Sequence, residues 1–529
     1  MPRPRLTWLG LLFAIASSGP LAAQALTPRD SARHALNRLA YGPRPGEVDR
    51  VAAMGVMHWI DQQLDPTRLP DRVLAGRERE FRILSTDDRE LAQMVRQQRQ
   101  ERIRRQQATA NGMMSPANQG DQTGERLRIA AQLQQLAVVR AVLSERQLQE
   151  VMSDVWLNHF NVYWAKGADR FYMASYVEQV IRPRAMGKFE DLLVATAQSP
   201  AMLFFLDNWE SVAPGAVPPG VARGVPRDSM RRRALPTGPN ENYARELLEL
   251  HTLGVDGGFT QQDVIEVARI LTGWSIARPA QSGRFQFNDW AHDYGEKMVR
   301  GVRFPAGHGM EEGLRFLHRL AIDPATMRHV SHRLCARFVA DDPPDGCVDD
   351  AVKAWRRTDG DIRAVLRAIF ESPDFWTPQA LRAKVKTPLE FVVSAVRAVG
   401  GDPDTTSRLA QMVTLLGQPL YLEPSPAGYP ESQEEWVNSG ALLHRMNAAV
   451  ALAAGRLPGV SVALEGLLPH SADPDTLIDA VDTRLLGGGI LTAHTRNVMR
   501  QQLADIHNPV AARMLVVGLA LGGPEFQKQ

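Results

Sequence analysis

The sequence predicts a mainly α-helical protein, a multi-helix body with a small β hairpin near residues 284–304 and irregular insertions. Apolar residues recur at helical spacing along most of the chain, and helix start and stop signals flank these segments. The alternation typical of a strand is convincing only around Phe285 and Phe287. Two stretches without periodicity, about 106–124 and 212–237, predict flexible insertions.

The composition is that of an ordinary globular protein. Of the 529 residues, 44% are hydrophobic and 23% are charged, which allows a large core. The net charge of +2 provides no overall field that would attract nucleic acid, so we expect no nucleic-acid partner. We predict that residues 26–529 form a single large helical domain, although the length alone also allows about two to four domains.

The first 25 residues have the parts of a secretory signal peptide. Arg3 and Arg5 supply the basic start, and Leu6–Ala16 is an apolar segment too short to span a bilayer comfortably. Ala23-Gln24-Ala25 fits a cleavage site, so we expect cleavage after Ala25, with an uncleaved anchor as the alternative. The mature protein is then expected to be periplasmic or secreted, without a transmembrane span.

Export changes the interpretation of the two cysteines. In an oxidising compartment Cys335 and Cys347 are expected to form a disulfide, because the turn-rich stretch ADDPPDG between them can bring them together. Closing a loop of about a dozen residues stabilises a protein by roughly 3 kcal/mol on chain-entropy grounds. Two free buried thiols are the alternative.

The segment Pro239–Trp274 contains the clearest helix start and stop signals in the chain. Asn240 is a good N-cap, Gly254 follows the apolar positions as a helix stop, and Thr260 with Asp263 fits the cap of a second helix. The segment therefore predicts two helices joined by a tight glycine-containing turn.

One face of the first of these helices carries polar and ionisable residues. Asn242, Arg245, Glu246 and Glu249 stand at i, i+3, i+4 and i+7, which places them in one stripe. An amide, a guanidinium and two carboxylates can perform acid–base chemistry or bind a cation when another element lies opposite. A solvated face in which Arg245 pairs with Glu241 and Glu249 explains the same pattern.

Two histidine sites are further candidates. His292 and Asp293 are adjacent, with Lys297 four residues on, and such a pair can ligate a metal or act as a base with its orienting carboxylate. His159 lies in the aromatic run Trp156–Trp164. The alternatives are a loop histidine that contacts solvent or backbone, and a hydrogen-bonded core histidine.

Several well-marked catalytic motifs are missing from the sequence. It contains no G-x-S-x-G elbow, no Walker phosphate loop, no dinucleotide fingerprint and no H-E-x-x-H. These absences disfavour the best-marked hydrolases, nucleotide hydrolases and zinc peptidases, and leave the type of reaction open.

Nine segments together resemble the bacterial family called domain of unknown function 1800, over most of the chain. These are WLNHF (156–160), FLDN (205–208), NENYARELLELHTLG (240–254), FTQQDV (259–264), ARILTGW (268–274), His292-Asp293-x-Gly295-x-Lys297, KTPLEFVV (386–393), GQPLY (417–421) and GYPESQEEWVNSGALLHRMN (428–447). One departure is Gly428-Tyr429-Pro430, where the family tends to have Gly-Trp-Pro.

The resemblance implies an exported, mostly helical protein with no established activity or cofactor. Members are often encoded beside a second secreted family resembling sulfatases and alkaline phosphatases, which implies a protein partner of that kind. The family's recurrent polar positions map to His159, Asp207, Asn208, Asn240, Asn242, Arg245, Glu246, Glu249, Thr272, Trp274, His292, Asp293 and Lys297.

Two functions follow as hypotheses. In the first, the chain is a hydrolase-like enzyme acting on an extracytoplasmic polymer, and its catalytic residues are Glu246, Glu249, Arg245, His292, Asp293 and His159. Its substrate-binding residues are then Asn240, Asn242, Asp207, Asn208, Trp274 and Lys297. In the second, the chain is a non-catalytic binding or assembly module for a secreted sulfatase- or phosphatase-like partner, and the same residues form a buried structural network. Metal dependence is left open by both.

Overall fold

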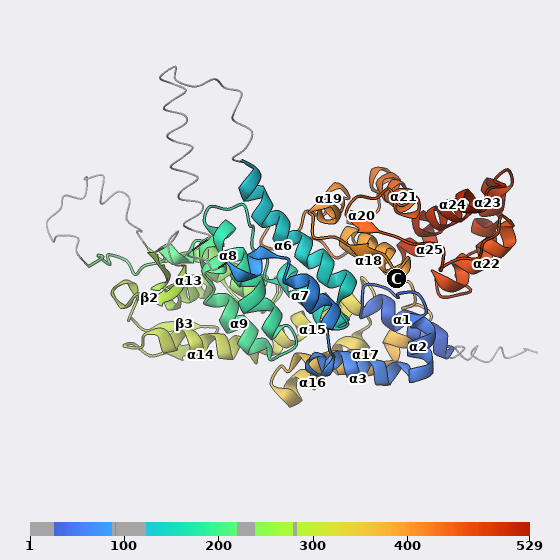
Figure 1. Cartoon of the computed structure of the whole chain (residues 1–529). Helices are drawn as coiled ribbons and strands as arrows, with labels where there is room; N and C mark the ends of the chain where they lie inside the picture. Colours follow the sequence, from blue (N-terminus) through green and yellow to red (C-terminus); the bar gives the residue numbers. More distant parts are fainter. Residues whose placement is uncertain (1–25, 87–89, 91–122, 220–237, 279–282) are drawn as a thin grey trace, which may run out of the picture.

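Helices make up most of the structure, a computed structural model that describes residues 26–86, 90, 123–219, 238–278 and 283–529 (Figure 1). Within these ranges the strands form three short two-stranded antiparallel pairs. The predicted mainly α fold is therefore confirmed. The predicted signal peptide (1–25) and the larger parts of the predicted insertions (106–122 and 220–237) lie outside the described residues.

The N-terminal helices begin and end where local signals predict. The side chain of Thr27 caps the first helix by accepting a hydrogen bond from the Asp30 backbone, and Pro28 follows as the first helical residue. Gly55, with φ +91°, separates the second helix from the third. The helices of this part are α1 (Pro28–Arg38), α2 (Glu47–Met54), α3 (Val56–Leu64) and α4 (Arg72–Glu78).

Helix α18 (Pro388–Ala398) is buried at every residue and packs against α6 (Thr123–Leu143) and α19 (Arg408–Leu415). A helix that is buried on all sides belongs to the middle of a core. The other helices in the middle part of the chain are α7 (Gln147–His159), α8 (Asp169–Ser175), α9 (Phe189–Ala197), α10 (Pro200–Phe205), α15 (Pro324–Phe338), α16 (Asp345–Thr358) and α17 (Ile362–Glu371). Single short turns of helix cover Pro66–Arg68, Arg82–Ser85, Tyr176–Ile181, Arg182–Arg184, Asn208–Glu210, Asp289–Ala291 and Pro373–Trp376.

The strands β1 to β4 lie at one end of the molecule, beside α13 and α14 (Figure 1). The elements here are α12 (Glu241–Glu249), α13 (Gln261–Ile270), β1 (Trp274–Ala277), β2 (Arg284–Phe287), β3 (Lys297–Val299), β4 (Val302–Phe304) and α14 (Met310–Ala321). The hairpin predicted near 284–304 is present as β3–β4, whereas β2 pairs back with β1. The ring of Phe285 packs edge-on against Trp274, with ring centroids 5.3 Å apart, which explains this backward pairing.

The C-terminal helices form the opposite end of the molecule (Figure 1). Helices α21 and α24 pack closely because Gly518 and Gly522 of α24 lie directly against Val450 and Met446 of α21. The elements of this part are α20 (Gln433–Trp436), α21 (Ser439–Ala453), α22 (Pro474–Arg484), α23 (Ala493–Leu503), α24 (Pro509–Gly522), α25 (Pro524–Gln527) and the strand pair β5 (Asp402–Pro403) and β6 (Val460–Ser461).

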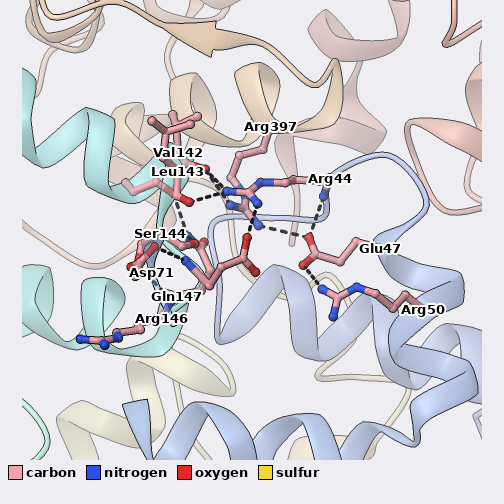
Figure 2. A network of polar contacts seen from close by, with 12 residues as sticks. Arg44, Glu47, Arg50, Asp71, Val142, Leu143, Ser144, Arg146, Gln147 and Arg397 are labelled. Carbon is pink, nitrogen blue, oxygen red and sulfur yellow. Dashed lines mark hydrogen bonds and ion pairs between the residues drawn. The ribbon is translucent and has the colours of Figure 1, made fainter. Parts of the chain in front are cut away.

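A polar network fastens α18 to the end of α6 and to the loop after α1 (Figure 2). The buried guanidinium of Arg397 donates to the carbonyl oxygens of Gly42 at 2.8 Å and Val142 at 2.9 Å. Arg44 donates to the carbonyl oxygens of Val142 at 2.8 Å and Leu143 at 2.7 Å. The last carbonyl groups of a helix lack partners within the helix and carry partial negative charge, so two guanidinium groups are well placed there.

The predicted disulfide is present. Cys335 of α15 and Cys347 of α16 are bonded, with their Cα atoms 6.3 Å apart. The bond joins two consecutive helices across the turn-rich connection that the sequence indicated.

Candidate functional site

Helix α12 forms as predicted, and its polar stripe lies at the surface. The side chain of Asn240 caps the helix by accepting from the backbone of Asn242 at 2.8 Å. Asn242 is exposed, while Arg245, Glu246 and Glu249 are half-buried. Burial, together with the nearby charge of Glu249, raises the pKa of Glu246.

Arg245 finds a different partner from the two glutamates that its spacing suggested. Its Nη2 donates to the side-chain oxygen of Gln261 on α13 at 2.6 Å, and the Gln261 amide donates to Glu241 at 2.7 Å. Gln261 therefore bridges the two helices at an exposed edge, and the carboxylates of Glu246 and Glu249 have no hydrogen-bond donor among the described residues.

Asp207, Asn208 and Asn240 hold turns of the backbone. The fully buried amide of Asn208 donates to the carbonyl oxygens of Leu271 at 3.2 Å and Trp274 at 3.1 Å. Asp207 adopts φ +60° and pairs with Lys166 at 2.8 Å. Asn240 also donates to the carbonyl oxygen of Leu206, at 3.1 Å.

His292 is buried, and both of its ring nitrogens lie next to backbone carbonyl oxygens. Nδ1 lies 2.8 Å from the Thr272 oxygen, and Nε2 lies 3.0 Å from the His308 oxygen. Lys297, also buried, pairs with Glu312 of α14 at 2.6 Å and donates to the Asp293 carbonyl oxygen.

Asp293 completes this cluster with a two-pronged ion pair to Arg269 of α13, at 2.8 and 3.3 Å. Burial alone raises the pKa of Asp293, but the hydrogen bonds from Arg269 and from the Gly295 backbone hold it below its usual value. Trp274 lies beneath, fully buried, with its ring against Gly313 of α14. The His292 cluster thus ties one loop to α13, β1 and α14.

His159 is a third, separate site in the core. Its Nε2 lies 3.1 Å from the carbonyl oxygen of His251, and its ring packs edge-on against Phe160 and Trp156. Burial, with the nearby charge of Arg333, lowers the pKa of His159 well below its usual value, so the ring is neutral. Among the described residues, no hydrogen bond, ion pair or ring contact joins His159, the His292 cluster and the α12 stripe. Their assigned catalytic and binding roles remain predictions.

A different pocket brings together several of the segments that carried the family resemblance. It is a cavity of about 70 Å³ between the end of α7, α15, the start of α18 and the loop that precedes α21. We call it the Asp154 pocket. Its lining residues are Asp154, Val155, Leu157, Asn158, Asn161, Arg337, Lys384, Val385, Thr387, Glu390, Gln418, Leu420, Tyr421, Tyr429, Pro430, Glu431 and Trp436.

Backbone hydrogen bonds to two asparagines fix the outer wall of this pocket. Asn158 accepts from the Tyr429 backbone N–H at 2.7 Å and donates to the Tyr429 carbonyl oxygen at 2.9 Å. Asn161 donates to the carbonyl oxygens of Glu423 at 2.9 Å and Ser425 at 2.6 Å. The Asn158 amide at the end of α7 and the Asn161 amide in the turn after it therefore hold the loop that precedes α21.

Within the described part of the chain, every charged group that lines the pocket has a partner, except Asp154. Arg337 pairs with Glu390 at 2.6 Å, and Glu390 also accepts from the backbone of Thr387. Burial alone raises the pKa of Glu390, but Arg337 holds it below its usual value. The remaining ion pairs are Lys384 with Asp341 and Glu431 with Arg333.

The Asp154 carboxyl group forms no hydrogen bond or close ion pair with any described residue. Burial raises its pKa to about 7; the charge of Arg337 opposes this rise, and the charges of Glu390 and Glu431 add to it. A carboxyl group with this pKa changes its protonation state near neutral pH, which is what a general acid or base requires.

Tyr421 lies beside Asp154 in the lining, with strained backbone. Its φ is +63°, a conformation that costs a residue with a side chain about 1–3 kcal/mol and that gathers at functional sites. The Trp164 backbone N–H donates to its carbonyl oxygen at 2.9 Å and holds this conformation. Its phenol forms no hydrogen bond to described residues, so it remains available to a group in the cavity.

Comparison with known proteins decides the family. The profile described as "Protein of unknown function (DUF1800)" matches residues 34–528, nearly the whole chain. The chain belongs to this family. No curated protein and no solved structure matches it.

Two further observations apply to this DUF1800 protein. In the described ranges, no group of three or more His, Cys, Asp or Glu side chains is arranged to hold a metal ion. Among the same residues, none of the helices is both long and apolar enough to cross a membrane.

The sequence of this DUF1800 chain contains one signal for the Asp154 pocket that motif reasoning missed. Asp154 and Asn158 stand at i and i+4 on one face of α7, and Asn161 follows in the turn just after the helix. The helical spacing of polar residues that identified the stripe on α12 is therefore also present on α7. Its partners in the pocket, such as Arg337 and Tyr429, lie far away in sequence and carry no spacing signal.

Proposed function

We propose that the chain is an exported, hydrolase-like enzyme in which Asp154 transfers the proton. One observation carries the proposal: among the described residues, Asp154 is an unpaired carboxyl group in a cavity whose other charged lining residues are paired. Asp154 is half-buried, and partial burial of a carboxyl group without a partner costs stability, so its presence in a reachable cavity favours a chemical role.

The neighbours of Asp154 supply the other parts that hydrolysis needs. As a carboxylate, Asp154 takes a proton from a water molecule that attacks the substrate, and as a carboxylic acid it returns a proton to the leaving group. Arg337, fixed by Glu390, provides positive charge for the oxygen on which negative charge develops. The free phenol of Tyr421 offers a second donor in the same lining.

The substrate we propose is an extracytoplasmic polymer. The signal-peptide pattern in residues 1–25 supports export, to the periplasm or beyond. A cavity of about 70 Å³ admits a few waters or one small group, so the reaction is proposed to remove a projecting group of the polymer.

The second candidate is a non-catalytic module that binds a secreted sulfatase- or phosphatase-like partner. The His292 cluster favours it, because Lys297, Asp293 and His292 bind other groups of the same chain. Residues that only fix helices and loops against each other need no substrate.

The experiment compares Asp154→Asn with the double variant Glu246→Gln/Glu249→Gln. Purified mature protein is incubated with envelope polymers of the host, and released small products are measured by mass spectrometry. We expect release by the wild type and the double variant, and at least about 100-fold slower release by folded Asp154→Asn. Equal release by Asp154→Asn would refute the proposal. Loss in the double variant alone would place the chemistry on α12. No release by any form, with capture of a secreted sulfatase- or phosphatase-like protein, would favour the module.

A further inference from the structure

A second cavity, of about 30 Å³, lies where α1 and α18 meet the C-terminal helices. We call it the Lys386 cavity. Its lining residues are Arg33, Asn37, Pro43, Arg382, Lys386, Ser394, Ala398, Leu485, Leu486, Ile490, Glu525, Phe526 and Lys528. Lys528 is exposed and Asn37 is half-buried, so the cavity is reached from the surface.

The ammonium group of Lys386 is buried here without an anionic partner among the described residues. The residue is 3% exposed, and its Nζ lies 3.6 Å from the centroid of the Phe526 ring. The Lys386 ammonium forms no hydrogen bond to any residue that the structure describes. The face of an aromatic ring offsets part of the cost of burying the charge, but supplies no hydrogen-bond acceptor.

The guanidinium of Arg382 is also incompletely satisfied. Its Nη2 donates to the Glu525 carbonyl oxygen at 3.0 Å, whereas its Nε is buried without a partner in the described part of the chain. Arg382 adopts φ +58°, the left-handed conformation that residues with side chains rarely take. Strained backbone of this kind persists where the surroundings hold it, and often where a ligand binds.

The charges around the cavity do not balance. Arg33 is neutralised by Asp30 at 2.6 Å, but Arg382, Lys386 and Lys528 face a single carboxylate, that of Glu525. One oxygen of Glu525 already accepts from the hydroxyl groups of Thr492 at 3.0 Å and Thr495 at 2.6 Å, while its other oxygen is buried without a hydrogen-bond partner among the described residues. Positive charge therefore remains in excess.

We propose that the Lys386 cavity binds a small oxyanion group, a carboxylate or a phosphate, with Lys386 and Arg382 as its donors. The volume of about 30 Å³ suits the head of such a group, since one water needs about 10–15 Å³. The group would provide the acceptor that both cations lack, in hydrogen bonds strengthened by charge. This site is separate from the Asp154 pocket and does not depend on the proposed hydrolysis.

The pKa of Lys386 agrees with this geometry. Burial lowers it to about 7; nearby Glu390 opposes this shift, and the charges of Arg445 and Arg382 add to it. A bound anion favours the charged form of an amine, so binding restores the full ammonium.

The test is calorimetric titration of the full mature chain with sodium acetate and with sodium phosphate, against sodium chloride at equal ionic strength. We expect saturable binding of at least one of the two oxyanions beyond the chloride control. Lys386→Met should weaken it about tenfold or more, as for the loss of one hydrogen bond to a charged group. The matched control Lys353→Met removes an exposed lysine and should change nothing.

The two anions distinguish the source of the group. Binding of acetate alone identifies a carboxylate ligand, and binding of phosphate alone identifies a phosphate ligand. A second variant, Arg382→Met, is used if Lys386→Met does not fold, and the same weakening is expected. The proposal is overturned if the wild type binds neither oxyanion more strongly than chloride, or if the variants bind as the wild type does.

Discussion

Asn158 and Tyr429, 271 residues apart in sequence, are joined by a pair of hydrogen bonds, one in each direction, at 2.7 and 2.9 Å. A side-chain amide that matches both backbone groups of one residue replaces the pairing that a strand would provide. This contact closes the loop before α21 over the end of α7 and so forms the outer wall of the Asp154 pocket.

The close approach at Asn158 requires glycine at position 428. A Cβ there would collide with the Asn158 carbonyl oxygen, and the φ of Gly428 is +76°. Gly428→Ala should therefore lower the free energy of unfolding by more than about 2 kcal/mol and disturb the pocket. Gly46→Ala is the matched control, because Gly46 has the same φ with no atom near its Cβ position. Urea unfolding of both variants measures the difference, and equal losses would contradict the wall described above.

The ion pair between Arg337 and Glu390 is buried, so removing one partner should be costly. Arg337→Met leaves the Glu390 carboxylate without its cation, and we expect a loss of about 3–5 kcal/mol in chemical denaturation. Arg328→Met removes an exposed arginine that pairs with Asp345 and Asp349, and should cost less than about 1 kcal/mol. A small loss in Arg337→Met would show that Arg337 is not needed to hold the pocket.

The disulfide should contribute to stability through the loop that it closes. Its cysteines are 12 residues apart, so the double variant Cys335→Ala/Cys347→Ala should lose roughly 3 kcal/mol. Thermal unfolding of the wild type with and without a reducing agent gives an independent measurement. A reducing agent should lower the melting temperature of the wild type and leave that of the double variant unchanged; an unchanged wild type would argue against a stabilising bond.

The His292 cluster is predicted to be structural, and charge removal tests this directly. Lys297→Met leaves Glu312 buried without its cation and should cost about 3–5 kcal/mol. Replacing both residues, as Lys297→Met/Glu312→Leu, should recover most of that loss, because a buried ion pair gives way to apolar side chains of similar size. If the double variant is stable but loses product release in the polymer assay, the cluster has a functional role instead.

Local signals in the sequence predicted local structure well. Asn240 and Thr260 cap their helices, and the two cysteines pair, because each of these features depends on residues close in sequence. The sequence also predicted the strand at Phe285, but not which segment it pairs with. The segments on both sides could pair with it, and the packing of Phe285 on Trp274 selects β1.

The arrangement of the site was harder to predict. The stripe on α12 and the stripe on α7 look alike in sequence, and only the tertiary structure shows that α12 presents its stripe at an exposed edge while Asp154 lines a cavity. The pKa of Asp154 depends on burial by Tyr421 and other distant residues, which no spacing rule reports.

The pH dependence of stability at Asp154 tests the central claim most directly. With a pKa of about 7 in the folded state and 3.8 as the ordinary value, the folded protein binds more protons than the unfolded chain between these values. Protonated Asp154 therefore contributes to the free energy of unfolding. This contribution is fully present below about pH 3.8, falls as the pH rises, and is lost once the pH passes about 7. Asp154→Asn lacks this titration.

The measurement is the free energy of unfolding of the wild type minus that of Asp154→Asn, from urea denaturation at about pH 5 and about pH 8. We predict that this difference falls by about 3 kcal/mol between the two pH values. The reason is that one extra proton on the folded state changes the free energy of unfolding by about 1.4 kcal/mol for each pH unit up to the pKa. A difference that is the same at both pH values would show that Asp154 is solvated or paired, and would contradict its proposed role as the proton-transfer group.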